Sequence, residues 1–401
     1  MSFRYADSYL VLENAQPISL SLPIREGPFN EPICRAWFAN LLPEGEIRWQ
    51  VARKLGVSER NDFDILEGIG GECAGALRIV PESETRVPDS ELVPLPWDKL
   101  ETAIASRPRS PLLALMLQDI ELRLSLAGAQ NKLPVHYAAG KLSLPMGSAA
   151  STHLLKVGSE DFPDLVQNEV YCLNLARRAG LPVPPTELAD TETPILLVER
   201  YDRRPGPDGT ITRLHQEDFC QALGVPPESK YETEGGPSLE NMFEVLARGS
   251  RSPLPDKRDL IRWIIFNFII GNADSHAKNV SFLLGAIGEN SAPRLAPFYD
   301  LVCTRIYGGL SSKMAQKIGG EYRPGFLARR HWERFANIIG VNFNYLSTVG
   351  LELCATVEKL AGPLAGDLGD SLGGEEILEK IAEVIGKRTD RLKTAFNQSG
   401  Q

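Results

Sequence analysis

The feature that most constrains the fold is a run of apolar residues followed at once by a polar, chemically reactive loop. The run "DLIRWIIFNFII" (259–270) is apolar enough to be a helix anchored in a core. The loop "GNADSHAKN" (271–279) carries Asp274, His276, Lys278 and Asn279. Side chains of these types commonly transfer protons, bind metal ions or bind phosphate groups. Whether the loop is a functional site or only a polar corner depends on the rest of the chain.

The order of the expected elements predicts an α+β fold. A β-rich first part with a helical segment at 31–56 is followed by a strand, a helix and a strand, and the chain is mostly helical after about residue 215. The strands are "THLLKV" (152–157) and "PILLVERYD" (194–202), and the helix between them stops at Gly180. "VSFLLG" and "RLAPFYDLV" form a later strand pair. The C-terminal segment 375–396 is expected to be amphipathic, with positions 377, 381 and 385 on one face. This order predicts two lobes with a cleft between them.

Composition and charge exclude several classes of protein. The 401-residue chain has a net charge of −9, whereas a broad nucleic-acid-binding face needs clustered lysines and arginines. The six cysteines (34, 73, 172, 220, 303 and 354) form no Cys-x-x-Cys pair, which argues against structural zinc and a disulfide framework. The sequence has neither a secretory signal nor an apolar stretch long enough to span a bilayer. We therefore expect a cytoplasmic protein with no membrane partner.

The spacing within the loop matches the catalytic loop of protein kinases. Asp274 and Asn279 are separated by four residues, as in D-x-x-x-x-N. In kinases the Asp accepts the proton of the attacking hydroxyl, and the Asn holds a magnesium ion. Asp300 follows in "PFYDLV" (297–302), where a carboxylate can reach the same ion and bridge it to nucleotide phosphates.

Segments upstream supply other parts of a kinase site in kinase order. "THLLKV" places Lys156 on a strand, and Glu169 lies on the following helix. Such a Lys–Glu pair steadies nucleotide phosphates in kinases. "LLVERYD" (196–202) resembles the hinge strand that contacts adenine. No G-x-G-x-x-G loop precedes Lys156, and "SLAGAQNK" (125–132) stands in its place. Each piece is weak alone, but five in this order are hard to obtain by chance.

A longer set of motifs is similar to the HipA family, the serine/threonine kinases that serve as toxins of bacterial type II toxin–antitoxin modules. The motifs are "SLAGAQNKLPV", "THLLKVG", "NEVYCLNLARRAGLPVP", "LLVERYDR", "LHQEDFCQALG", "KYETEGGPS", "GNADSHAKNVSFLL" and "LAPFYDLV". The similarity runs from about residue 18 to near the C-terminus. Family members usually begin with a longer β-hairpin region, and this chain enters near its end, so a shortened N-terminal subdomain is expected.

The resemblance implies a role for each residue that matches a motif. Asp274 would be the catalytic base, and Asn279 and Asp300 would bind magnesium. The loop covering the phosphates would be Ala127, Gly128, Ala129, Gln130, Asn131 and Lys132. The other nucleotide contacts would be Lys156, Glu169, Glu199, Arg200, Tyr201, Gln216, His276, Lys278 and Tyr299. Ser125 matches the regulatory autophosphorylation serine, where a phosphate adds about two negative charges and would expel the loop.

The resemblance also implies a fold, a domain order and partners. The fold would be two-lobed and protein-kinase-like, with a β-rich N-lobe and a mostly helical C-lobe. Residues 1–105 would form an N-terminal subdomain, 106–203 the kinase N-lobe and 204–401 the C-lobe. The Pro-rich, acidic stretch 81–98 is interpreted as a linker or long surface connection. The enzyme would use ATP and Mg²⁺ to phosphorylate a translation-related protein, with glutamyl-tRNA synthetase the known family example. A HipB-like helix-turn-helix antitoxin would neutralise it and bring it to operator DNA.

Other interpretations compete with this one. The chain could be an antitoxin-bound nucleotide-binding corepressor with little transfer activity, or a small-molecule phosphotransferase. Asp274 and Asn279 are also common turn residues, and Lys156 with Glu169 could be only a surface ion pair. Ser125 could be an ordinary strand serine, and His276 a histidine satisfied by backbone groups. A basic cluster is interpreted as a solvated helical face, or else as a contact for substrate or operator DNA. It comprises Lys313, Lys317, Arg323, Arg329, Arg330 and Arg334.

Overall fold

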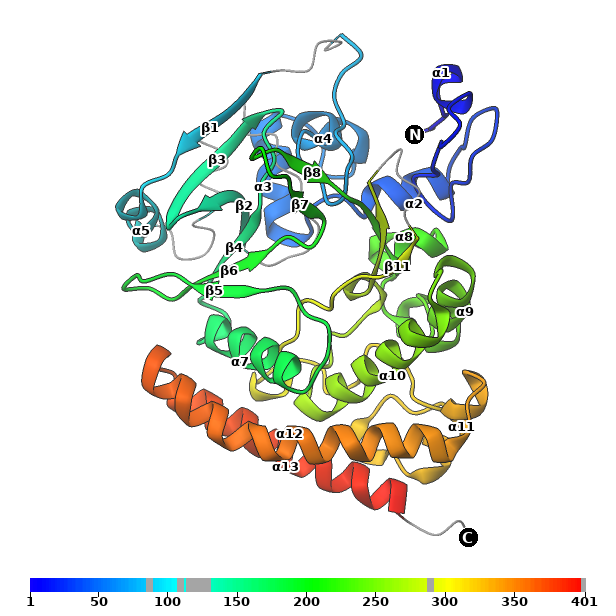
Figure 1. Ribbon diagram of the computed structural model, residues 1–401, viewed down its shortest axis with the longest axis vertical. Helices are drawn as coiled ribbons and strands as arrows, with labels where there is room; N and C mark the ends of the chain where they lie inside the picture. Colours follow the sequence, from blue (N-terminus) through cyan, green and yellow to red (C-terminus); the bar gives the residue numbers. More distant parts are fainter. Residues whose placement is uncertain (84–88, 107–111, 113–130, 287–291, 398–401) are drawn as a thin grey trace. The chain divides into compact units, whose positions relative to one another are not determined.

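The computed structural model describes residues 1–83, 89–106, 112, 131–286 and 292–397 (Figure 1). The chain forms two compact units. The first contains residues 1–163, 184–227 and 282–293, and the second contains 164–183, 228–281 and 294–401. Each unit is described by itself. The domain boundaries predicted after residues 105 and 203 stay predictions.

The centre of the first unit is a six-stranded sheet whose strands pair antiparallel in the order β1-β3-β2-β4-β6-β5 (Figure 1). The strands are β1 (Ser90–Pro94), β2 (Lys132–Ala138), β3 (Lys141–Gly147), β4 (His153–Val157), β5 (Thr186–Leu188) and β6 (Ile195–Glu199). The turn between β2 and β3 places Ala139 and Gly140 at positive φ, 50° and 75°, which is the backbone geometry that a tight hairpin requires. Buried residues of β2, β3, β4 and β6 form one apolar core with Leu100 of α5 (Trp97–Ser106).

One prediction about this sheet was wrong. The stretch 81–98 is not only a connection, because Ser90–Pro94 forms β1 and pairs along its whole length with β3. β1 is an edge strand of the sheet, so one of its two edges forms no hydrogen bonds with another strand. A proline, which has no N–H to donate, is therefore tolerated at position 94. Most residues of β1 are exposed, so the strand lacks the alternating apolar pattern that reveals strands in a sequence.

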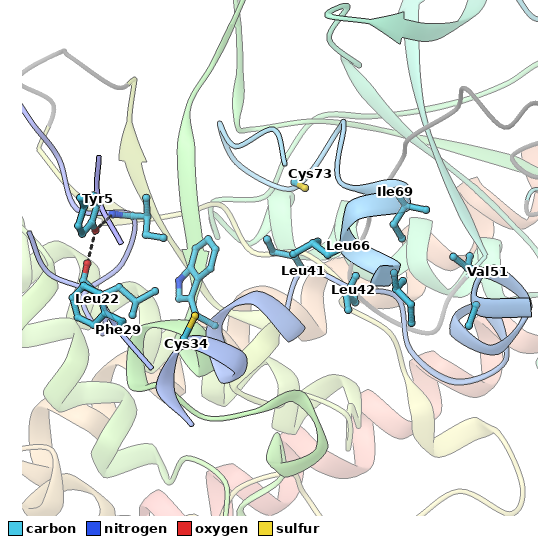
Figure 2. Close-up of a cluster of buried hydrophobic side chains, with 14 residues drawn as sticks. Tyr5, Leu22, Phe29, Cys34, Leu41, Leu42, Val51, Leu66, Ile69 and Cys73 are labelled. Atoms are coloured by element: carbon cyan, nitrogen blue, oxygen red, sulfur yellow. Dashed lines mark hydrogen bonds between the residues drawn. The ribbon is translucent and has the colours of Figure 1, made fainter. Parts of the chain in front are cut away.

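The N-terminal part of the first unit has its own apolar core (Figure 2). The fully buried side chains of Trp37, Leu42 and Ile65 lie at its centre. They come from the segments around α2 (Ile33–Ala39), α3 (Gly45–Leu55) and α4 (Asp62–Ile69), with α1 (Asp7–Leu10) before them. The helical segment predicted at 31–56 is two helices, α2 and α3. The break contains Pro43, which has no N–H for a helical hydrogen bond.

The remaining elements of this unit follow the six-stranded sheet along the chain. They are the paired strands β7 (Arg203–Pro205) and β8 (Ile211–Arg213), then β9 (His215–Asp218) and α8 (Phe219–Leu223). The 3-10 turn η1 (Pro227–Ser229) begins at the last residue of this segment and continues into the second unit. The predicted strand "VSFLLG" is confirmed as β10 (Ser281–Gly285), which pairs with β9. The ring of Phe219 stacks on that of Phe282 with centroids 4.7 Å apart, so α8 and β10 pack together.

The second unit is built around helix α10 (Pro253–Ile270), which contains the apolar run seen in the sequence. Ten of its last eleven residues are buried: Leu260, Ile261, Trp263, Ile264, Ile265, Phe266, Asn267, Phe268, Ile269 and Ile270. Around it lie α7 (Leu165–Arg178), α9 (Leu239–Gly249), α11 (Arg329–Ile338), α12 (Phe343–Leu372) and α13 (Glu375–Asn397). Shorter elements are η2 (Glu232–Glu234), η3 (Ala277–Asn279), β11 (Arg294–Leu295), η4 (Thr304–Ile306) and η5 (Pro324–Phe326). The predicted core helix is confirmed.

Two sequence predictions in this unit have different outcomes. Ile377, Ile381 and Ile385 of α13 are all buried, which confirms the predicted apolar face. The strand predicted for "RLAPFYDLV" is confined to Arg294–Leu295. Pro297 cannot donate to a strand ladder, and Asp300 has a φ of +52°, so neither residue can continue a regular strand.

The long helices α12 and α13 run side by side (Figure 1), and a glycine allows their close approach. A Cβ atom at Gly350 of α12 would lie 2.2 Å from Cε2 of Phe396 in α13. The Phe396 ring is buried and meets the rings of Trp332 and Phe343 edge-on, with centroids 5.3 and 5.9 Å away. The ring therefore has little space to move.

We expect Gly350→Ala to lower the free energy of unfolding by about 1–3 kcal/mol, because it overpacks this contact. Gly366→Ala on the same helix is the matched control. A Cβ atom there meets nothing within 4 Å, and alanine favours a helix by up to about 1 kcal/mol over glycine. Urea denaturation followed by circular dichroism measures both changes. Equal stability of the two variants would contradict the close contact.

No single helix in the described part of the chain is both long and apolar enough to cross a membrane. The pair α11 and α12 has the required length and composition only when the two are taken together, and these helices meet at 116°.

All six cysteines are free and buried. Burial raises the pKa of the Cys34 thiol to about 11 and that of the Cys73 thiol to about 12. Thiols of this kind are unreactive while the protein is folded, because the thiolate is the reactive form.

Candidate active site

Helix α10 ends in a way that fixes the start of the polar loop. Gly271 has a φ of +72°, and its N–H donates to the carbonyls of Asn267 and Phe268, the usual glycine stop of a helix. A Cβ atom at Gly271 would lie 2.9 Å from Val384 and 3.1 Å from Cβ of Arg305. Glycine is therefore required here by both conformation and space, and the loop leaves the helix in one direction.

The buried side chain of Asn272 joins three parts of the second unit. Its amide nitrogen donates to Oδ1 of Asn267 at 2.8 Å and to the main-chain oxygen of Asp300 at 3.4 Å. Its Oδ1 accepts from the N–H of Asp274 at 3.0 Å. One side chain thus ties helix α10, the predicted base and the predicted metal ligand Asp300 together. Asn272 was not among the predicted site residues, although it stands two residues before Asp274.

Further hydrogen bonds hold the loop from outside and from within. The N–H of Ala273 donates to Oγ1 of Thr304 at 2.8 Å, and that hydroxyl donates to the Gly271 carbonyl at 3.2 Å. Nδ2 of Asn279 donates to the Asp274 main-chain oxygen at 2.9 Å. Asn279 therefore does stabilise a turn. Only the amide nitrogen of Asn279 takes part in this hydrogen bond, so its amide oxygen remains available to a metal ion.

The Asp274 carboxylate is half exposed, with 50% of its side-chain surface accessible. The Tyr231 hydroxyl donates to Oδ1 of Asp274, and Nε2 of His276 lies 3.9 Å from the same oxygen. The His276 ring meets the Tyr231 ring edge-on with centroids 5.2 Å apart. The carboxylate is thus oriented on one side and accessible on the other, as a base acting on an external hydroxyl requires. Tyr231 was missed as a site residue, although it lies in the motif "KYETEGGPS".

Asp300 lies beside the loop in an unusual backbone conformation. Its φ of +52° is rare for a residue other than glycine, and such conformations persist where surrounding contacts enforce them. Next to it, the Tyr299 hydroxyl donates to the Lys278 carbonyl at 2.8 Å and lies 2.6 Å from Oγ of Ser281. The Tyr299 hydroxyl therefore helps to hold the loop, and its predicted contact with the nucleotide stays a prediction.

The residues present fit the magnesium ion that the family resemblance implies. Asn279 and Asp300 offer an amide oxygen and a carboxylate, which are ligand types that magnesium prefers. In the described ranges no three His, Cys, Asp or Glu side chains gather as a metal site. A cation here would have two protein ligands and take the rest from water and phosphate oxygens, which is how magnesium is usually held beside nucleotides.

In the first unit, part of the predicted nucleotide site can be described. Lys156 is buried on β4, opposite Lys132 on β2. The Tyr201 hydroxyl donates to Oε1 of Gln216, so two predicted nucleotide contacts lie together. Glu199 ends β6, the predicted hinge strand, and Asn131 directly precedes β2. Ser125, Ala127, Gly128, Ala129 and Gln130 lie outside the described residues.

The structure gives Arg200 a different role from the one predicted. Its guanidinium is buried and bonds to Asp202 at 2.7 and 2.9 Å, to Glu72 at 3.3 Å and to Oγ of Ser151 at 2.9 Å. Its N–H donates to the Thr152 carbonyl, and its own carbonyl accepts from the following chain. Every polar part of Arg200 is thus engaged inside the first unit, which makes it a structural residue rather than a nucleotide contact.

The predicted site residues divide between the two units. Lys156, Glu199, Tyr201 and Gln216 belong to the first, whereas Asp274, His276, Lys278, Asn279, Tyr299 and Asp300 belong to the second. Glu169 is also in the second unit, where it is buried on α7. The pairing of Lys156 with Glu169 therefore stays a prediction.

Comparisons with known proteins identify the family. Residues 1–80 match the HipA N-terminal domain, and residues 124–361 match the HipA-like C-terminal domain. The chain is 41% identical to Y4mE of Sinorhizobium fredii, whose name classes it provisionally as a kinase, over 92% of this chain and 87% of that one. It is 31% identical to the serine/threonine-protein kinase toxin HipA of Shewanella oneidensis, over 82% and 76% of the two chains.

A solved structure agrees with these sequence relationships. HipA of Shewanella oneidensis, solved in complex with HipB and operator DNA, superposes with a TM-score of 0.79 and 26% identity. The likeness covers 98% of this chain and 91% of that one. The predicted α+β, kinase-like fold class is thereby confirmed. The chain belongs to the HipA family of kinases.

Proposed function

We propose that this protein is an ATP- and magnesium-dependent serine/threonine kinase of the HipA type. The observation that supports it best is the loop 271–279, in which a half-exposed Asp274 carboxylate is oriented by Tyr231. Asn272 ties the same loop to Asp300. A turn that served only the fold would not need an accessible carboxylate held in this way.

The proposed reaction gives distinct tasks to three residues of the loop and to four residues outside it. Asp274 accepts the proton of the substrate hydroxyl as that oxygen attacks the γ-phosphorus of ATP. Asn279 and Asp300 would hold a magnesium ion, which would neutralise charge on the transferred phosphoryl group. Asn272 keeps the base and Asp300 in register. Lys156, with Tyr201 and Gln216, contributes to nucleotide binding.

The proposed substrate and partners come from the family. We propose a translation-related protein as substrate and a HipB-like antitoxin as partner, through which the kinase reaches operator DNA in the cytoplasm. The supporting finding is that the Shewanella HipA structure contains HipB and operator DNA. We also propose Ser125 as the site of regulatory autophosphorylation. Its position in "SLAGAQNK" supports this.

Incubation of the purified protein with γ-labelled ATP tests the proposal. We expect label to appear on protein when magnesium is present and to be absent in excess EDTA. Loss of self-labelling in Ser125→Ala, with transfer to other proteins retained, would identify the autophosphorylated residue. ATP binding without any transfer would instead indicate a corepressor. Turnover only with aminoglycosides or sugars would indicate a small-molecule phosphotransferase, and either result would overturn the proposal.

Replacing Asn272 with alanine should lower kcat roughly tenfold or more, because small misplacements of catalytic groups are costly. Asn344→Ala is the matched control, since Asn344 is exposed on α12. The rates are compared per folded molecule, with the folded fraction measured by circular dichroism. An Asn272→Ala protein with wild-type kcat would show that Asn272 does not position the base.

A further inference from the structure

We propose that Arg305 and Arg388 form, with Ser311 and Ser312, a binding site for a phosphate monoester dianion. The four residues line one recess in the second unit, together with Phe268 and Met314. The enclosed part of the recess holds about one water molecule, and the rest of it opens to solvent. Arg305, Ser311 and Ser312 are exposed, so an anion could reach them from solvent. The site is separate from the Asp274 carboxylate and from the proposed metal ligands, none of which lines the recess.

The charges that line the recess are cationic and lack compensation from acidic groups. In the part of the chain that the structure describes, neither Arg305 nor Arg388 forms an ion pair with a carboxylate. Arg305 is exposed and Arg388 is half-buried, whereas the buried Arg200 and Arg203 of the first unit meet Glu72 and Asp202. The guanidinium of Arg388 lies 5.2 Å from the Phe268 ring centroid, which compensates its charge only in part.

The charges around Arg388 also favour a bound anion. Burial, together with the neighbouring charges of Arg305 and Arg391, lowers the pKa of Arg388 to about 10. Two like charges held close together destabilise the protein unless something neutralises them. A bound dianion would do so, because it offers two negative charges to two guanidinium groups and oxygen acceptors to the serine hydroxyls.

The chemistry of the donors favours a dianion such as a phosphate monoester over a carboxylate. Guanidinium groups bind phosphate oxygens in pairs, through charge-assisted hydrogen bonds. A phosphate monoester carries nearly two negative charges at neutral pH, whereas a single carboxylate carries one. Among the described residues of the recess, Ser312 makes no side-chain hydrogen bond, while Oγ of Ser311 accepts only the N–H of Lys313 at 3.2 Å. Both hydroxyls can therefore donate to a ligand.

The recess touches the start of the catalytic loop. Gly271, Asn272 and Ala273 contribute to its wall, and the N–H of Arg305 donates to the Gly271 carbonyl at 3.2 Å. An anion held by Arg305 would therefore affect the position of the segment that carries Asn272. Any effect of the anion on catalysis depends on the proposed kinase function, but its binding does not.

Isothermal titration calorimetry with the full chain tests the site, with inorganic phosphate and O-phosphoserine as probes at constant ionic strength. A saturating non-hydrolysable ATP analogue and magnesium are present, so that the nucleotide site is blocked. We expect saturable binding that weakens roughly tenfold or more in Arg305→Gln and in Arg388→Gln, because each change removes charge-assisted hydrogen bonds. Tighter binding of O-phosphoserine than of phosphate would identify an esterified ligand. The reverse order would identify the free ion.

Lys380→Gln is the matched control, because it removes one positive charge from an exposed position of the same helix, and Lys380 neither lines the recess nor is among the charges that shift the pKa of Arg388. It should bind phosphate like the wild type. Equal binding by all three variants, or no binding by the wild type, would overturn the proposal. Melting temperatures provide a second readout that does not depend on activity. Without phosphate, Arg305→Gln should melt at or above the wild-type temperature, and added phosphate should raise only the wild-type and Lys380→Gln values. A phosphate-dependent rise in Arg305→Gln would also contradict the site.

Discussion

Asp274→Asn is expected to lower the rate of phosphoryl transfer by about a thousandfold, because the proposed general base is lost. Asparagine has the same shape and can still accept the hydrogen bond from the Tyr231 hydroxyl. It cannot take up the proton of the substrate hydroxyl. Stability and ATP affinity should therefore stay close to the wild-type values, while kcat falls. Initial rates with γ-labelled ATP, together with nucleotide affinity from calorimetry, separate these quantities.

The matched control is Asp370→Asn, which removes an exposed carboxylate from α12. Its transfer rate should equal that of the wild type. Transfer by Asp274→Asn within tenfold of the wild-type rate would show that another group accepts the proton, and the assignment of Asp274 would then be wrong. Loss of ATP binding in the same variant would instead assign Asp274 to nucleotide binding.

Glu72→Gln should destabilise the protein by about 3–5 kcal/mol, since it removes one partner from a buried group of charges. Oε1 of Glu72 accepts hydrogen bonds from Arg203 at 2.8 Å and from Arg200 at 3.3 Å, and Oε2 accepts one from Arg213 at 2.7 Å. All these side chains are buried or half-buried in the first unit. With glutamine at this position, Asp202 alone would balance three arginines.

The same carboxylate should make stability depend on pH. Burial by itself would raise the pKa of Glu72, but the charges of Arg203, Arg200 and Arg213 outweigh it and hold the pKa at about 2. Because this folded-state pKa lies below the ordinary value of 4.5, the stabilisation is complete above pH 4.5 and is lost as the pH falls toward 2. The total is roughly 3 kcal/mol for a shift of this size.

Urea denaturation at several pH values between 2.5 and 7 measures both effects. The free energy of unfolding of the wild type should decrease as the pH falls below 4.5, and that of Glu72→Gln should be lower at pH 7 and change less. Glu46→Gln, an exposed position on α3, is the control and should follow the wild type. If Glu72→Gln is as stable as Glu46→Gln, the buried charges do not depend on Glu72.

Local patterns in the sequence predicted those features that local interactions determine. The core helix α10, the amphipathic face of α13 and the strands β4 and β6 all follow from the spacing of apolar residues. The loop 271–279 was predicted because Asp274 and Asn279 lie within one short stretch of chain. The edge strand β1 was missed because it is largely exposed and so has no alternating apolar pattern.

Partners that lie far apart in the chain could not be predicted in this way. Arg200 follows the predicted hinge strand, and its position there suggested a nucleotide contact. Its guanidinium instead meets Glu72, 128 residues away, and no local pattern reveals such a pair. Asn272 was missed for a related reason, because its role depends on the main chain of Asp300, 28 residues later. Roles that arise from tertiary contacts require the structure.

The distribution of the buried thiols has a practical consequence. Cys34, Cys73 and Cys220 belong to the first unit, and Cys172, Cys303 and Cys354 belong to the second. Each half of the molecule thus carries three natural probes that react with an alkylating agent only when their surroundings open. Mass spectrometry of alkylated peptides can therefore reveal whether the halves unfold together or one before the other, without any engineered label.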